Sequence, residues 1–88
     1  MPRKPIPPDT FDTVLRLRRR VRDNIRVLAE QRGWSMQMVA DLAGVSRSQL
    51  FNVLGCRASP RLDWLAKVAA VFEVDVRRLL DPCEPRGD

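Results

Sequence analysis

The sequence predicts an all-α fold, a compact bundle of five short helices. Apolar residues recur every three or four positions along most of the chain, which is the helical period. Ser, Thr or Asp precedes these segments and Gly or Pro follows them, as at helix ends. No segment alternates apolar and polar residues as a strand does. With 88 residues, the chain is expected to form one domain with a modest core.

The composition is that of a soluble globular protein, with 31% charged and 44% hydrophobic residues. No apolar run approaches the roughly 20 residues that span a bilayer, and the N-terminus has no apolar signal core. A cytoplasmic, nucleoid-associated protein without a membrane partner is therefore expected. Of the net charge of +5, all the excess lies in residues 1–32, with nine Lys or Arg against four Asp or Glu. This basic surface is suited to a polyanion, although a solvated helix face is the alternative.

The residue types argue against catalysis and against a metal or other cofactor. The chain has no His, and its two cysteines, Cys56 and Cys83, are far apart. This excludes the usual zinc spacings and the commonest general base. A disulfide between the two is disfavoured in a reducing cytosol. No nucleophile has an obvious activating partner and no Gly-rich phosphate loop appears, so no enzymatic activity is expected.

Residues 1–10 are predicted to form a flexible, basic, Pro-rich arm that includes Arg3 and Lys4. Thr10 is a candidate cap for a first helix from Phe11 to Arg32, which Gly33 ends. Because about 22 residues is long for a small domain, a break near residues 18–20 is considered. The helix is amphipathic, with an apolar stripe of Val14, Leu17, Val21, Ile25 and Leu28 and a basic side of Arg16, Arg19, Arg20, Arg22 and Arg26.

Two short helices joined by a tight turn follow. Ser35 is predicted to cap a helix that ends at about Ala43, and Gly44 allows the turn its positive φ. Ser46 caps the next helix, and Gln49 completes a capping box with it. That helix ends near Leu54–Gly55. Two short helices joined in this way are typical of a helix-turn-helix.

The helix over residues 46–54 has an apolar side and a polar side. The apolar side consists of Leu50 and Val53, with Val45 just before it. The polar side chains are of the lengths and kinds that reach the edges of DNA bases: Arg47, Ser48, Gln49 and Asn52. In a small basic chain, this pattern predicts that the helix reads DNA.

Two further helices complete the predicted bundle. Ser59 and Pro60 are expected to open a fourth helix, with an inner face of Leu62, Leu65, Val68, Ala69 and Phe72. Asp75 is expected to cap a short fifth helix, with Val76, Leu79 and Leu80 turned inward. Asp81 and Pro82 end it, and residues 81–88 should be frayed.

From Val21 to Leu80 the sequence resembles the lambda-repressor-like, Cro-type (XRE) helix-turn-helix DNA-binding family. The matching segments are "LAEQRGWS", "VADLAGVSRSQL", Pro60 and "LAKVAAVFEVDVRRLL". The resemblance implies a Cro-type domain over residues 21–80, with residues 11–20 as an extension of its first helix. It also implies a bacterial or phage transcription regulator, of repressor or controller type, whose helix 46–54 enters the major groove of double-stranded DNA.

The resemblance also implies individual contacts. Base contacts fall to Arg47, Ser48 and Asn52, with Gln49 and Phe51 nearby. For Arg47 the alternative is a phosphate contact, and for Phe51 it is packing within the domain. The implied phosphate contacts are made by Ser35, Gln37, Arg57 and Arg61. For the two arginines, the alternative is an ordinary surface position.

Three departures from the family pattern affect these expectations. Met36 stands where relatives have a phosphate-binding Gln. Ala29 and Leu54 stand where relatives bury an Arg–Glu pair, so a hydrophobic contact is expected instead. Cys56 replaces a Gly in the loop, which suggests a different turn; a redox role for it has no visible low-pKa environment to support it. Trp34 is expected in the core.

Homodimers of such domains bind two-fold operators, and a homodimer is expected here. The candidate dimer surface is Trp64, Val71 and Leu79, or else the N-terminal segment with Phe11, Val14 and Leu15. In a competing hypothesis that segment is a DNA arm, in which Arg3 and Lys4 follow phosphates or enter the minor groove. The alternative function is a protein-interaction module, such as an antitoxin or adaptor that binds a protein partner.

Overall fold

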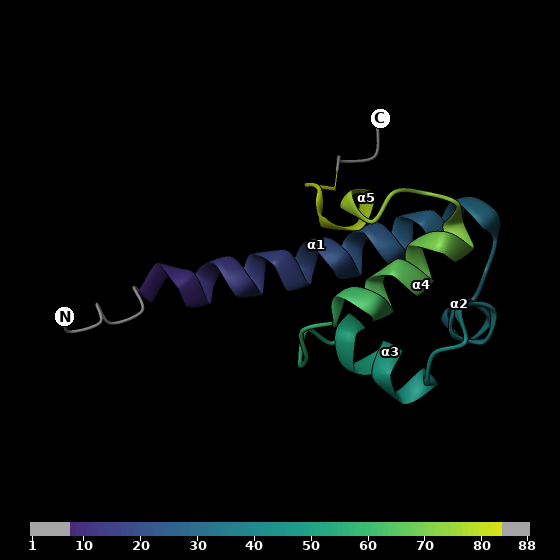
Figure 1. The fold of residues 1–88 in the computed structure, drawn as a ribbon, viewed down its shortest axis with the longest axis horizontal. Coiled ribbons are helices and arrows are strands. Elements are labelled where there is room, and N and C mark those ends of the chain that lie inside the picture. Colours follow the sequence, from purple (N-terminus) through teal and green to yellow (C-terminus); the bar gives the residue numbers. More distant parts are fainter. Residues whose placement is uncertain (1–7, 84–88) are drawn as a thin grey trace.

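The computed structural model describes residues 8–83, which form five α helices and no strand (Figure 1). In chain order these are α1 (Pro8–Arg32), α2 (Met36–Ala43), α3 (Arg47–Leu54), α4 (Leu62–Phe72) and α5 (Arg77–Leu80). The long helix α1 packs against α5, α3 and α2, and α2 also packs against α4 and α3. The predicted all-α, five-helix fold is confirmed.

Helix α1 begins earlier than expected and is continuous over 25 residues, so the predicted start at Phe11 and the break near residues 18–20 are both wrong. Pro8 can open the helix because the first N–H groups of a helix have no partner within it. Asp9 in the first turn favours the helix through its dipole. Thr10 lies inside the helix and does not cap it. Arg3 and Lys4 lie outside the described residues.

The two halves of α1 have different surroundings. In the second half Val21, Ile25 and Leu28 are buried against the other helices. The first half (purple in Figure 1) extends away from them, and the side chain of Phe11 is 68% exposed there. The first half of α1 therefore carries an exposed aromatic side chain beyond the end of the bundle.

The core lies between the second half of α1 and the four shorter helices. Ala29 and Leu54 are both buried in it, which confirms the expected hydrophobic replacement of a charged pair. Trp34 packs against the core as predicted and stacks on Phe72, with their ring centroids 5.6 Å apart. Arg32 lies against both rings and donates a 2.7 Å hydrogen bond from Nη2 to the Phe72 carbonyl at the end of α4. These contacts join the ends of α1 and α4.

The ends of α1, α2 and the start of α3 follow the sequence prediction. The Ser35 hydroxyl accepts a hydrogen bond from the Met38 N–H at 3.1 Å, and the Ser46 hydroxyl accepts one from the Gln49 N–H at 3.2 Å. Gly33 and Gly44 have φ of +69° and +67°, as helix-ending glycines do. The reciprocal bond of a capping box, from the Gln49 side chain, is not formed among residues 8–83.

Helix α4 differs from its prediction. It begins at Leu62 and not at Ser59–Pro60, and no side chain caps it. Leu62, expected in the core, is 78% exposed because it lies in the first turn, where no neighbouring element covers it. Trp64, two residues further along the helix, is buried.

Helix α5 is fixed by side chains from two directions. The Asp75 carboxylate accepts a 2.8 Å hydrogen bond from the N–H of Arg77, the first residue of α5; the N-cap position itself is Val76, so Asp75 satisfies the first turn from one residue further back than predicted. From α1, the fully buried Asn24 donates hydrogen bonds to the carbonyls of Leu79 and Asp81 at 2.9 and 2.8 Å. These bonds satisfy carbonyl groups at the end of α5.

Candidate nucleic-acid interface

Helix α3 separates its residues into a buried and an open side. Leu50, Val53 and Leu54 are buried in the core. The remaining five residues are exposed, and they are the five base-contact candidates: Arg47, Ser48, Gln49, Phe51 and Asn52. Since residues three or four apart share a helix face, burying one side presents the others together. Phe51 is 44% exposed, so its own domain covers it only in part.

Arg47 is held by a partner that the sequence did not suggest. Its Nε and Nη2 donate hydrogen bonds to Oδ1 and Oδ2 of Asp41 on α2, at 3.2 and 2.8 Å. The hydrogen bond with Arg47 lowers the pKa of the Asp41 carboxyl below its ordinary value and raises that of the guanidinium. Both side chains are more than half exposed. The pair therefore links the two helices of the motif on the outer surface.

A groove runs between α3 and the start of α4. Gln49 and Asn52 line it from α3, and Arg61, Asp63 and Lys67 line it from the other side. Its walls therefore combine amide groups with charges of both signs. The groove opens beside the exposed face of α3.

Two arginines of α1 hold the loop between α3 and α4. Arg18 donates hydrogen bonds from Nε to the Ser59 hydroxyl at 2.9 Å and from Nη1 to the Cys56 carbonyl at 3.4 Å. The Arg22 Nη1 lies 3.8 Å from the Cys56 sulfur. Cys56 keeps a left-handed conformation, with φ of +57°. The expectation of a different turn is wrong, because the residue adopts the conformation that a glycine would have there.

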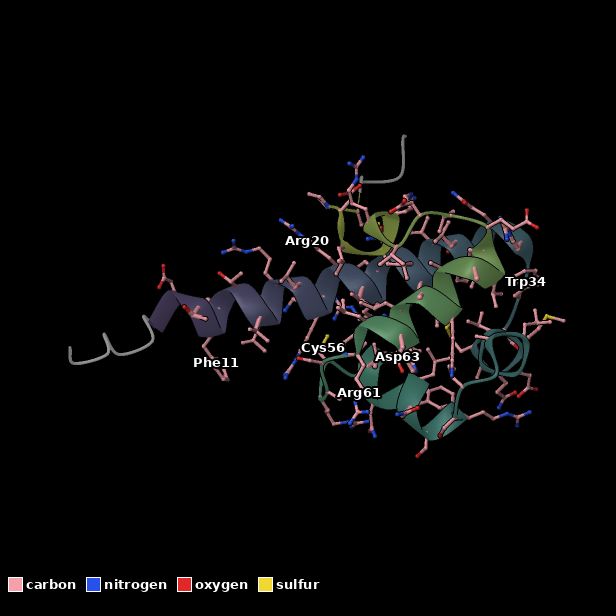
Figure 2. All side chains as sticks on the ribbon, in the orientation of Figure 1. Phe11, Arg20, Trp34, Cys56, Arg61 and Asp63 are labelled. Atoms are coloured by element: carbon pink, nitrogen blue, oxygen red, sulfur yellow. The ribbon has the colours of Figure 1, made fainter. Side chains whose placement is uncertain are left out.

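The phosphate-contact candidates lie at the two ends of the motif. At the start of α2, the Ser35 hydroxyl is occupied as a helix cap, whereas Gln37 is exposed. Met36 packs against the core. Arg57 and Arg61 are exposed after α3 (Arg61 is labelled in Figure 2). The Arg57 guanidinium folds back over Gly55, where an added Cβ would lie 3.2 Å from its Cζ.

Two of the three residues of the candidate dimer surface on α4 and α5 are buried. Trp64 is 6% exposed and Leu79 is fully buried, so both side chains belong to the core of this domain. Val71 is half-buried. The prediction for Trp64 and Leu79 is wrong because Trp64 belongs to the core cluster and α5 packs directly on α1.

No group of three or more His, Cys, Asp or Glu side chains in residues 8–83 is placed to hold a metal ion. Over the same residues, no helix has the length and apolar character needed to cross a membrane. Cys56 forms no disulfide bond.

Comparison with known proteins identifies the motif. A helix-turn-helix family model (HTH_3) matches residues 25–79, more than half of the chain. The transcriptional regulator SinR of Bacillus subtilis is 34% identical over 58 residues, which are 65% of this chain and 52% of SinR. The chain thus matches about half the length of that relative.

Solved structures of transcription regulators also match this chain. A hypothetical transcription factor, NHTF, from Neisseria superposes with a TM-score of 0.74 at 29% identity, over 78% of each chain. An HTH_3 family transcriptional regulator from Vibrio cholerae shares the fold, with a TM-score of 0.69 at 24% identity, over 75% of this chain and 37% of that one. These matches confirm the Cro-type resemblance, and the chain belongs to the HTH_3 helix-turn-helix family.

Proposed function

We propose that this chain is a DNA-binding transcription regulator that reads double-stranded DNA with the open face of α3. The main support is the arrangement of α3, whose buried side anchors it while five polar or aromatic side chains face outward. An α helix fits the major groove, where Arg bonds guanine and Asn bonds adenine through paired hydrogen bonds. The relatives are named as transcription regulators, which supports a regulatory and not an enzymatic role.

Phosphate contacts from both ends of the motif would fix this helix in the groove. Gln37 at the start of α2 and the exposed Arg57 and Arg61 after α3 are the groups proposed for them, with Ser35 contributing its backbone N–H. Such contacts set the register on the duplex without reading its sequence. Arg18 supports them indirectly, because it holds the loop that bears Arg57.

We also propose a homodimer on a two-fold operator. One recognition helix spans only a few base pairs, and a dimer places two of them about 34–36 Å apart, one turn of DNA. With Trp64 and Leu79 buried, the projecting half of α1 is the stronger candidate for pairing with a second copy. Phe11 and Leu17 are exposed there, and two copies related by a two-fold axis would each present the same apolar stripe. Replacing Phe11 with Ser should shift sedimentation toward the monomer, whereas Thr10→Ser should not.

The test of DNA reading begins with duplexes selected by the wild-type protein from a random pool. The double variant Arg47→Ala, Asn52→Ala should lose at least tenfold affinity for the selected duplex, since each paired contact contributes roughly 1–3 kcal/mol. A matched control is Arg77→Ala, Gln31→Ala, which removes one charge and one amide from exposed positions on α5 and α1.

The control should retain selective binding. If the double variant binds the selected duplex as the wild type does, α3 is not the reading helix. If the wild type selects no sequence at all, the protein-interaction role, as an antitoxin or adaptor, becomes the better account.

A further inference from the structure

The geometry of the Asp41–Arg47 pair determines which part of the guanidinium remains available. The carboxylate takes the side formed by Nε–H and one N–H of Nη2. A guanidinium has five N–H donors in a fixed plane, so the edge formed by Nη1 and Nη2 keeps its two parallel donors. Arg47 has no second acceptor among residues 8–83. That free edge can bond O6 and N7 of a guanine together.

Helix stability does not explain this pair. Its side chains are 56% and 57% exposed, and exposed ion pairs contribute little to folding. Arg47 is the first residue of α3, at the positive end of that helix dipole, and Asp41 is in the last turn of α2, at its negative end. Each charge is therefore at the unfavourable end of its own helix. The pair therefore fixes the position of the Arg47 guanidinium and does not serve to stabilise α2 or α3.

We propose that Asp41 is a specificity-determining residue, which holds Arg47 with its Nη1–Nη2 edge ready to bind a guanine. The inference rests on the proposed role of Arg47 in reading DNA. Fixing the side chain before binding reduces the ordering cost of the contact. The carboxylate also places a negative charge close to the DNA, which weakens attachment to any duplex, whereas the contact of the positioned Arg47 is made only at a site with the guanine; the difference between right and wrong sites therefore comes from that contact.

The experiment compares Asp41→Asn with the wild type on three kinds of duplex: the selected one, a scrambled one, and a series in which each guanine of the selected one is replaced in turn by 7-deazaguanine. That base lacks N7 and so removes one acceptor of the pair. The wild type should lose affinity by about tenfold at one guanine position, within the range of a paired contact. In Asp41→Asn, affinity for the scrambled duplex should rise severalfold and sensitivity at that guanine should fall to about twofold.

Glu73→Gln is the matched control, because it removes one carboxylate charge at the end of α4 opposite the α3–α4 loop. It should leave the sensitivity at the guanine unchanged. Urea unfolding of Asp41→Asn should match that of the wild type, so that lost discrimination is not lost folding.

Two results would overturn the inference. In the first, Asp41→Asn keeps the full tenfold sensitivity at the guanine. In the second, Asp41→Asn binds the selected duplex more tightly and discriminates better than the wild type, which would mean that Asp41 only competes with DNA for Arg47. Arg47→Ala separates this failure from that of the proposed function. If Arg47→Ala loses the sensitivity and Asp41→Asn keeps it, only the role of Asp41 is wrong; if neither loses it, Arg47 does not read the guanine.

Discussion

The buried amide of Asn24 should be the most important polar group for the stability of this domain. Asn24 donates two hydrogen bonds to carbonyls at the end of α5 and accepts one from Arg78 Nη1, at 2.8–2.9 Å. Each bond contributes about 1 kcal/mol net. Replacing Asn24 with Leu, which is apolar and similar in size, removes all three bonds and leaves the buried Leu79 carbonyl without the hydrogen bond from Asn24. A loss of about 3 kcal/mol is expected.

Urea unfolding followed by circular dichroism measures this loss. The matched control is Asn52→Leu, the same change on the exposed face of α3, which should alter the free energy of unfolding by no more than about 0.5 kcal/mol. In Asn24→Leu the amide protons of α5 should also exchange faster than in the wild type. A loss below about 1 kcal/mol for Asn24→Leu, or one no larger than that of Asn52→Leu, would refute the reasoning.

Three other substitutions test separate parts of the structure. Arg18→Ala removes the hydrogen bonds to the α3–α4 loop and should increase hydrogen exchange at the backbone amides of Cys56 and Arg57. Unchanged exchange would mean that the loop keeps its conformation without Arg18. Glu73→Gly should stabilise the domain by about 1 kcal/mol in urea unfolding, because the residue has φ of +57° and the left-handed region costs L-residues about 1–2 kcal/mol. Arg47→Ala should raise the pKa of Asp41, measured by carboxyl NMR, toward its ordinary value, since the hydrogen bond from Arg47 lowers it. The lowered pKa means that the contribution of the ion pair is present above the unfolded pKa and is lost as pH falls through the folded one; because both side chains are more than half exposed, this contribution is small, and the stability of Arg47→Ala should change with acid only slightly less than that of the wild type.

Features fixed by neighbouring residues were predictable from the sequence. Ser35 and Ser46 cap helices by bonding an N–H three residues ahead, and Gly44 ends α2 through its own left-handed backbone. The open face of α3 followed from the helical period alone. These are local relations, so the order of residues contains them.

Features that depend on distant residues were not predictable. Asn24 lies on the apolar stripe of α1, and only the approach of α5, 55 residues later, gives it partners. Ser59 looked like a helix cap but bonds Arg18, which is 41 residues away. Trp64 was a candidate for the dimer surface but is buried in the core cluster, because a helical wheel does not show which other helices pack on a given face. Each of these misjudgements comes from packing between elements.

The candidate site also contains residues that could be predicted from the sequence and one that could not. Four of its five outward residues on α3 were named from the pattern of that helix, and Phe51 was named from the family resemblance. Asp41 was not, because an exposed Asp six residues before an Arg has no distinctive spacing across a turn. The turn at Gly44 brings α2 and α3 together and makes the two side chains neighbours.

The most direct test of DNA reading by α3 is a hydroxyl-radical footprint on the DNA flanking the gene for this protein. The wild type should protect two segments related by two-fold symmetry, with centres about 10–10.5 base pairs apart or a multiple of this. The variant Arg47→Ala, Asn52→Ala should protect neither at the same concentration. A footprint that persists unchanged in that variant, or no protection by the wild type, would contradict the assignment of α3 as the reading helix.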